Sequence, residues 1–367
     1  MKILHIITSL RLGGAERLVA DLLPRFADRG HEVELLLFDG TRTPLYEQLE
    51  QQSVRIRALG KGFAQIWNPL HYFRLRRIFK NEHFDVVHTH NTPCQVQAAL
   101  AFPKKNGLLV TTEHNTFNRR RRWAWYGRID RRMYGCYDHI VCVGEQTKRN
   151  LIEKLGEKFE ETRLSVVENG IDLSRFVRAE ADKSLRGGED GPKHVIIMVA
   201  AFRPQKDQAT LVRAMQHLSD EYELWLVGDD PTRVSGERQT GIPPREDRVR
   251  RWGFRSDVPR LLATADVVVL SSHYEGMALS SIEGMAAGKP FIASDVEGLR
   301  DTIGGAGLLF PHEDDRKLAE LIRQVCENSD FAASVAKRCR ARAERFDIDT
   351  VVATYEQVYT TLSSHSV

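Results

Sequence analysis

Short apolar runs alternate with segments of helical periodicity along most of this chain, and this alternation constrains the fold more than any other feature. In the first half, the runs that predict strands are Ile3–Thr8, Val33–Phe38, Asp85–His88, Leu108–Thr112, His139–Val143 and Leu164–Val167. Between the first two, apolar residues recur at three- and four-residue spacing from Ala15 to Ala27, which indicates a helix that Gly30 ends. Strands and helices in alternation predict an α/β domain with a doubly wound parallel sheet.

The alternation starts again after a polar stretch with several glycines, Ala179–Lys193, which we interpret as a linker. The second set of predicted strands is Val195–Ala200, Glu223–Val227, Arg248–Phe254, Asp266–Leu270 and Pro290–Ser294, with helices from Asp207 and from about Leu279. We therefore predict two doubly wound domains, residues 1–178 and 179–346, and a C-terminal helix at about 347–367 that packs back on the first. Because open α/β sheets bind ligands at the carboxyl ends of their strands, we expect the domains to face each other across a cleft.

Composition narrows the classes of function. A length of 367 residues suits two domains, and a net charge of +3 indicates no general attraction to nucleic acid. Five cysteines without CxxC spacing argue against a disulfide framework and a zinc site. His5 and Arg11 interrupt the first apolar run, so we interpret it as a strand and not a signal peptide, and no apolar stretch is long enough to span a bilayer. We expect a cytoplasmic protein.

The segment from Ser271 to Pro290 joins a predicted strand to a predicted helix and carries two glutamates, Glu275 and Glu283, around a turn of small residues. A diphosphate at the start of that helix would meet unpaired N–H groups and the positive end of the helix dipole. Glu283 would then accept hydrogen bonds from ribose hydroxyls, and Glu275 from hydroxyls of a sugar. The alternative, which the pattern alone leaves open, is a solvated helix residue and a surface loop charge.

This segment resembles the EX7E motif of the family-four retaining glycosyltransferases, and other segments agree with that family in order and spacing. These are Gly13-Gly14-Ala15-Glu16, Thr112-Glu113-His114-Asn115, Glu168-Asn169-Gly170-Ile171-Asp172, Pro204-Gln205-Lys206-Asp207, Leu226-Val227-Gly228-Asp229, Asp257-Val258-Pro259 and Ala265-Asp266-Val267. The resemblance covers the chain from Met1 to about Asp315. It implies a GT-B fold, in which two Rossmann-like domains face each other across a cleft.

The resemblance also implies the activity. A hexose-type sugar would pass, with retention of anomeric configuration, from a UDP- or GDP-linked donor to a glycan or lipid-linked acceptor in the synthesis of cell-surface polysaccharide or glycolipid. The departing diphosphate would take the acceptor's proton in a front-face substitution, and neither a metal nor a cofactor is implied. The expected catalytic residues are Glu275, His114, Lys206 and Arg203. The expected donor-binding residues are Gly13, Gly14, Glu283, Gly276, Met277, Ala278, Leu279, Ser280, Trp252 and Phe254.

Two departures from the family pattern affect these expectations. Ala201 stands where the family commonly has an arginine, and Arg203 lies two residues further on, so we expect Arg203 to supply the second cation for the diphosphate. Gly241 and neighbouring glycine and proline residues interrupt a segment that is usually helical. The residues with which the family recognises the nucleotide base are therefore harder to assign near Trp252 and Phe254 in this sequence.

Two further patterns have competing interpretations. His88 and His90 lie two apart on one predicted strand, which suggests metal ligation, but no third ligand accompanies them at metal spacing and we favour packing or cleft lining. Arginines interleave with aromatic residues over Arg119–Arg132, and again from Phe73 to Lys80. Such a surface suits an anionic membrane, here the inner face of the cytoplasmic membrane, although a solvated amphipathic helix would show the same pattern. Without a stacking platform, nucleic-acid binding is disfavoured.

Two other functions remain open. One is another GT-B enzyme, such as a nucleotide-sugar epimerase or a phosphorylase, which product analysis with and without acceptor would distinguish. The other is a catalytically silent nucleotide-sugar-binding subunit of an assembly complex. Glu275 and Glu283 are both present, which weighs against the silent subunit.

Overall fold

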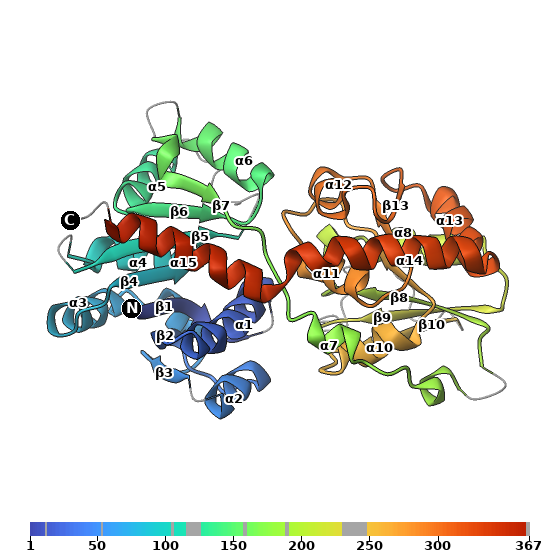
Figure 1. The fold of residues 1–367 in the computed structure, drawn as a ribbon, viewed down its shortest axis with the longest axis horizontal. Coiled ribbons are helices and arrows are strands. Elements are labelled where there is room, and N and C mark those ends of the chain that lie inside the picture. Colours follow the sequence, from blue (N-terminus) through green and yellow to red (C-terminus); the bar gives the residue numbers. More distant parts are fainter. Residues whose placement is uncertain are drawn as a thin grey trace. The chain divides into compact units, whose positions relative to one another are not determined.

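The structure is a computed structural model that describes residues 1–11, 13–52, 54–103, 106–114, 126–156, 160–187, 191–229 and 248–364. The chain divides into two compact units, one of residues 1–170 with 348–367 and one of residues 171–347 (Figure 1). Each unit is built on one parallel sheet with helices on its faces. The α/β class with two doubly wound sheets is therefore confirmed.

The first unit contains a seven-stranded sheet of order β3-β2-β1-β4-β5-β6-β7, in which every neighbouring pair is parallel. Its strands are β1 (Lys2–Ser9), β2 (Glu32–Asp39), β3 (Arg55–Ala58), β4 (Val86–His90), β5 (Leu108–Glu113), β6 (His139–Cys142) and β7 (Leu164–Val166). Its helices are α1 (Gly14–Asp28), α2 (Pro44–Gln51), α3 (His71–Asn81), α4 (Thr92–Ala101), α5 (Tyr126–Gly135), α6 (Glu145–Leu155) and α15 (Ile348–Ser364), with 3-10 turns η1 (Phe63–Trp67) and η3 (Glu161–Arg163).

Two apolar cores cover the two faces of this sheet. Helices α1, α2 and α15 contribute to one core, and α3 to α6 contribute to the other. From α15, the side chains of Ile348, Val351, Val352, Tyr355 and Tyr359 are buried in the first core. The last helix of the chain is thus part of the unit that contains the first strand, as Figure 1 shows for the red helix beside the blue strands.

The second unit contains a six-stranded parallel sheet of order β10-β9-β8-β11-β12-β13. Its strands are β8 (His194–Val199), β9 (Tyr222–Val227), β10 (Val249–Gly253), β11 (Val267–Leu270), β12 (Phe291–Ser294) and β13 (Leu308–Phe310). Its helices are α7 (Ser174–Val177), α8 (Gln208–Met215), α10 (Val258–Thr264), α11 (Leu279–Ala286), α12 (Glu297–Ile303), α13 (Asp315–Glu327) and α14 (Ser329–Ala343), with 3-10 turns η4 (Lys183–Arg186), η5 (Pro204–Lys206) and η6 (Glu344–Phe346).

The contacts change over from the first unit to the second after Gly170. The sequence predicts a linker at Ala179–Lys193, and the structure ties part of this stretch to the second unit. The backbone N–H of Asp182 donates to Thr264 Oγ1 at 2.8 Å, and Arg186 pairs with Asp266 at 2.6 Å. Although its composition is polar, the described part of this stretch is bonded to the second unit and is not a flexible linker.

Both sheets have a topological switch point, where the strand order reverses direction. In the first unit it lies between β1 and β4, and in the second between β8 and β11. Open α/β sheets bind ligands beside such points, outside the carboxyl ends of the strands. Most of the expected site residues lie in the loops after β1, β8 and β11 or in the helices α1 and α11 that follow two of these loops.

Candidate active site

The loop after β8 holds Lys206 in a rigid turn. The chain passes through η5 to Asp207, whose φ of 46° is in the left-handed region. The buried Asp207 carboxylate caps α8, because it accepts from the N–H of Thr210 at 3.2 Å and from its hydroxyl at 2.6 Å. These bonds stabilise an unusual backbone conformation directly after Lys206.

Backbone and side-chain hydrogen bonds join this loop to the loop after β11. The N–H of His273 donates to the carbonyl of Gln205 at 2.8 Å, and the Gln205 amide donates to the carbonyl of Tyr274 at 2.9 Å. The Ser271 hydroxyl donates to the carbonyl of Asp207 at 2.8 Å. Segments almost seventy residues apart in sequence are thereby held side by side.

Lys206 and Glu275 form an ion pair at the meeting point of these loops. Lys206 Nζ lies 2.5 Å from Glu275 Oε1, and the two side chains are 17% and 6% exposed. Burying a carboxylate is costly without a partner, so the ammonium is what permits Glu275 to lie inside the site. An ammonium has three N–H donors, so Lys206 can bind Glu275 and further acceptors together. Arg203 is exposed at the start of the same turn.

A residue that the sequence pattern did not single out shapes this loop. A Cβ on Gly298, at the start of α12, would lie 2.2 Å from the carbonyl oxygen of Glu275 and 2.6 Å from that of Gly276. Any side chain at position 298 would therefore displace the backbone that carries Glu275. The sequence around Gly298 gives no motif that would have identified it.

The helix α11 begins directly after this loop. Its first residues are Leu279 and Ser280, and its N-cap residue, Ala278, supplies no side-chain acceptor. The N–H groups of the first turn and the positive end of the helix dipole thus stand beside the Lys206–Glu275 pair without a side-chain cap. Gly276 and Met277 precede this start, and Glu283 is a half-buried residue in the second turn.

The two residues expected near the nucleotide base differ in their surroundings. Trp252, on edge strand β10, packs against the ring of Trp225 and has the guanidinium groups of Arg250 and Arg255 at 4.1 and 5.0 Å from its ring centroid. The side chain of Phe254, just beyond the strand, is 45% exposed. Phe254 thus presents the more accessible ring.

In the first unit, the paired glycines lie at the start of α1. Gly13 is the N-cap residue with extended backbone, and Gly14 is the first helical residue, both exposed. A Cβ on Gly13 would lie 2.1 Å from Glu16 Oε2, so glycine is what allows the Glu16 carboxylate to fold back over the turn. Asn91, at the end of β4, donates from its side chain to Glu16 at 3.2 Å. The two loops of this switch point are thus hydrogen-bonded to each other.

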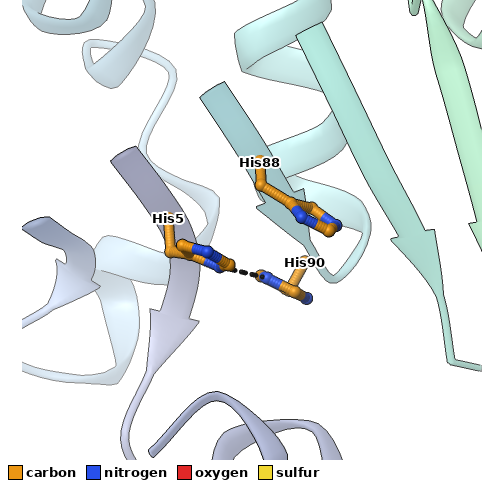
Figure 2. A group of neighbouring side chains, drawn as sticks. All are labelled: His5, His88 and His90. Carbon is orange, nitrogen blue, oxygen red and sulfur yellow. Dashed lines mark hydrogen bonds between the residues drawn. The ribbon is translucent and has the colours of Figure 1, made fainter. Parts of the chain in front are cut away.

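Four histidines form a group that extends from the middle of β1 and β4 to the carboxyl end of β5, and His114, the residue after β5, is one of them. His5 Nδ1 lies 3.0 Å from His90 Nε2, and His90 Nδ1 lies 3.0 Å from His114 Nε2. His88 stacks on His90, with ring centroids 4.5 Å apart, and is bonded to Tyr359 and Thr112. Figure 2 shows the rings of His5 and His90 pointing toward each other beneath His88.

Burial keeps these histidines uncharged. It lowers the pKa of His5 to about 3 and that of His114 to about 4, and it holds the pKa values of His88 and His90 well below the ordinary value. His5, His88 and His90 are completely buried, whereas His114 is half-buried by accessible surface. At neutral pH each ring therefore has one N–H donor and one acceptor nitrogen.

Among the residues that the structure describes, two groups of side chains bring potential metal ligands together. His5, His88 and His90 form one, with His5 as a third histidine that the sequence did not indicate. A metal lies in the plane of each imidazole that binds it, but His88 stacks on His90 at an interplanar angle of 16°, so their lone pairs do not converge. Hydrogen bonding explains this group better.

The second group, His273, His312 and Glu313, lies beside the Lys206–Glu275 loops. His273 Nδ1 is 2.7 Å from His312 Nε2 and 3.4 Å from Glu313 Oε1. Two imidazoles and a carboxylate form a donor set that suits Zn²⁺. A single N–H···N hydrogen bond also accounts for the contact of the two imidazoles.

The predicted membrane-facing stretch lies partly outside the described residues, which omit Asn115–Trp125. Of the second basic stretch, α3 presents Phe73, Arg74, Arg76, Arg77 and Lys80 as exposed side chains and buries Leu75 and Phe79. Phe63, Trp67 and Leu70, just before α3, are also more than half exposed. In the described ranges, every helix is too short or too polar to cross a bilayer.

Comparisons with known proteins agree with this architecture. A family model described as Glycosyltransferase Family 4 matches residues 12–175, and one described as Glycosyl transferases group 1 matches residues 193–328. The lipopolysaccharide core biosynthesis glycosyltransferase LpsD of Rhizobium meliloti is 35% identical over 330 residues, which cover 89% of this chain and 88% of that protein.

An Escherichia coli relative is described as a UDP-Gal:alpha-D-GlcNAc-diphosphoundecaprenol alpha-1,3-galactosyltransferase. It is 25% identical over 317 residues, which cover 81% of this chain and 80% of that protein. Among solved structures, HepE of Anabaena in complex with UDP and glucose matches with a TM-score of 0.82 at 23% identity, over 99% of this chain and 100% of that one. The chain therefore belongs to the family-4 glycosyltransferases, has the GT-B fold and is an enzyme of the hexosyltransferase type that uses a nucleotide-sugar donor.

Proposed function

We propose that this enzyme transfers a hexose, with retention of configuration, from a UDP-linked donor to a lipid-linked or glycan acceptor in the synthesis of a cell-surface polysaccharide or glycolipid. The observation that carries the proposal is the Lys206–Glu275 pair, with 2.5 Å between Nζ and Oε1, beside the start of α11 at a switch point. This arrangement combines a cation, a carboxylate and, four residues after Glu275, the start of a helix without a side-chain cap. All three groups can contribute to binding a sugar diphosphate.

In this proposal the second unit binds the leaving group. Lys206 and the first-turn amides of α11 stabilise the negative charge that develops on the diphosphate, and Arg203 adds a second cation. Because Lys206 keeps a donor on Glu275 while it binds a phosphate oxygen, the carboxylate lies next to the sugar attached to that phosphate. Glu275 then accepts from sugar hydroxyls.

The remaining expected residues hold the rest of the donor. Glu283 accepts from the ribose, Trp252 and Phe254 lie near the base, and His114 donates to or accepts from the sugar. Gly13 and Gly14 allow the ligand to approach the backbone closely. The diphosphate oxygen takes the proton of the acceptor on the face from which it departs, so the protein supplies position and charge without a base of its own.

The choice of donor and acceptor is supported by the relatives. HepE binds UDP and glucose, the Escherichia coli relative is named for UDP-Gal and a diphosphoundecaprenol-linked acceptor, and LpsD is named for lipopolysaccharide core synthesis. A lipid-linked acceptor fits the basic and aromatic side chains that α3 exposes, which suit anionic lipid, and the sequence of Arg119–Arg132 has the same composition. Cosedimentation with anionic liposomes that weakens as salt rises tests this surface, and equal binding to neutral vesicles would contradict it.

A donor and acceptor screen tests the proposed function. The purified enzyme is incubated with UDP- and GDP-sugars, with and without undecaprenyl-diphosphate-linked sugars or lipopolysaccharide core fragments, and nucleotide release and products are measured. We expect UDP release that depends on acceptor, and NMR of the product should show the anomeric configuration of the donor. Donor epimerisation without acceptor, or an inverted product, would overturn the proposal.

A further inference from the structure

A chain of hydrogen bonds connects His114 to the interior of the first unit. It runs from His5 on β1 through His90 at the end of β4 to His114, the residue after β5. Both links measure 3.0 Å between nitrogens. His114 uses Nε2 for this chain, so Nδ1 is the nitrogen that remains for a ligand.

The protons in this chain depend on one another. Each ring is neutral and bonds through one nitrogen to its neighbour, so a donor at one link requires an acceptor opposite. If His5 Nδ1 donates, His90 Nε2 accepts, His90 Nδ1 donates and His114 Nε2 accepts. His114 then has its proton on Nδ1. If His5 instead has its proton on Nε2, every link reverses and His114 Nδ1 is an acceptor.

The surroundings of His5, at the buried end of these hydrogen bonds, favour the state in which His5 Nδ1 donates. His5 Nε2 is buried and has no hydrogen-bond partner among the residues that the structure describes. Buried N–H groups without an acceptor are rarer in proteins than acceptors without a donor. The proton of His5 therefore belongs on Nδ1, where His90 accepts it.

We propose that His5 and His90 are positioning residues that hold His114 in the tautomer with its proton on Nδ1, so that His114 donates a hydrogen bond to a hydroxyl of the donor sugar. The inference rests on the proposed function, which puts His114 against that sugar. Beyond that function, the inference specifies that His114 is the donor in its hydrogen bond to the sugar, and that the buried residues His5 and His90 determine this direction.

His88 supplies a matched control for this role. It is as buried as His90 and stacks on it, but its own nitrogens bond to Tyr359 OH at 2.5 Å and to Thr112 Oγ1 at 2.7 Å. His88 therefore packs in the core and hydrogen-bonds two buried hydroxyls, but it forms no hydrogen bond with His114. A purely structural effect would appear in variants of either residue.

Two conservative variants of His90 separate the two links of the chain. In His90→Asn the amide stands near the position of Nδ1 and retains the bond to His114, whereas in His90→Gln it stands near Nε2 and retains the bond to His5. We expect His90→Gln to lower kcat/KM for transfer about tenfold, as for loss of an orienting partner. His90→Asn, which keeps the bond to His114 but loses the bond by which His5 sets its direction, should lower kcat/KM less than His90→Gln does. His88→Gln should stay within about threefold of wild type, and the affinity for UDP, which lacks the sugar, should not change in any of the three variants.

A measurement without turnover decides the direction of the bond. In the wild-type enzyme labelled with ¹⁵N-histidine, with His114→Ala used for assignment, long-range ¹H–¹⁵N correlation should show His114 protonated on Nδ1. A proton on Nε2, or equal losses of kcat/KM in His90→Gln and His88→Gln, would overturn the inference. Failure to detect glycosyl transfer with any donor would instead contradict the proposed function and would leave the NMR result to stand alone.

Discussion

The two switch points of this enzyme are built from opposite kinds of chemistry. The one in the second unit carries full charges on loops, with Lys206 and Glu275 in an ion pair 2.5 Å long. The one in the first unit carries neutral imidazoles on or beside the strands, with pKa values of about 3 for His5 and about 4 for His114. Charges suit a diphosphate and neutral hydrogen bonds suit hydroxyls, which is the chemical basis of the roles that we propose for Lys206 and His114.

The difference extends to how each site is held. Backbone hydrogen bonds between loops position Lys206 and Glu275, whereas His5 and His90 lie on adjacent parallel strands of the sheet. Loops tolerate rearrangement better than buried strands do. Substitutions in the charged site, which we define as Arg203, Lys206 and Glu275, should therefore change activity more than stability. Substitutions in the neutral site, which we define as His5, His88, His90 and His114, should change stability, and activity as well where the hydrogen bonds that reach His114 are cut.

The largest effect is expected at Glu275. In Glu275→Ala, transfer should fall by roughly a hundredfold or more, because a sugar contact and the partner of Lys206 are both lost. The protein should stay folded, since Lys206 is partly exposed and can turn to solvent. Steady-state kinetics and circular dichroism measure the two properties. Turnover close to that of wild type would remove Glu275 from the site.

Arg203 tests whether the charged site needs a second cation. Arg203→Ala should cost about 2 kcal/mol of transition-state stabilisation, which is roughly thirtyfold in kcat/KM, and Ala201→Arg together with Arg203→Ala should recover part of it. If the single variant stays within about twofold of wild type, Lys206 and the start of α11 suffice for the diphosphate.

The buried, neutral His88 should make the free energy of unfolding depend on pH. Below the ordinary histidine pKa of 6.5, His88 binds a proton in the unfolded chain but stays neutral in the folded protein, because burial lowers its pKa. The contribution of neutral His88 to the free energy of unfolding is therefore present above pH 6.5 and is lost as the pH falls. Between pH 6 and pH 5, His88→Gln should reduce the slope of unfolding free energy against pH by about 1 kcal/mol per pH unit. Urea denaturation at several pH values measures it, and identical slopes would indicate a hydrated, titrating His88.

The smallest expected effect concerns metal. Transfer should persist in excess EDTA, because Lys206 and the start of α11 supply the charge that a metal would otherwise provide. The His273, His312 and Glu313 group offers the control, since His273→Ala should leave the EDTA response unchanged. Loss of activity with EDTA that Mg²⁺ or Mn²⁺ restores would contradict the account of the charged site.

Most of the fold was predictable because buried parallel strands read as continuous apolar runs. Two edge strands were not. β3 has the sequence Arg-Ile-Arg-Ala, whose alternation reflects a half-exposed edge, and β13 has only three residues. Strands of three or four residues are too short for such a pattern to distinguish them from a loop.

The sequence indicated which residues to propose for the site, but not their contacts. Lys206 and Glu275 were recognisable from motifs near strand ends, yet their pairing depends on the bond between Gln205 and His273, which no local pattern encodes. His88 and His90 were visible as a pair, but His5 joins them through the register of β1 on β4, which places His5 opposite His88. Register between strands far apart in sequence comes from tertiary packing.

Calorimetric titration of UDP into wild type, Lys206→Ala and His114→Ala tests the division of labour between the two sites most directly. If the charged site binds the diphosphate and the neutral site contacts only the sugar, Lys206→Ala should weaken UDP binding about tenfold or more, as for a lost charge-assisted hydrogen bond. His114→Ala should bind UDP as wild type does and lose affinity or turnover only with the intact UDP-sugar. Equal UDP affinity in wild type and Lys206→Ala, or weaker UDP binding in His114→Ala, would contradict the account.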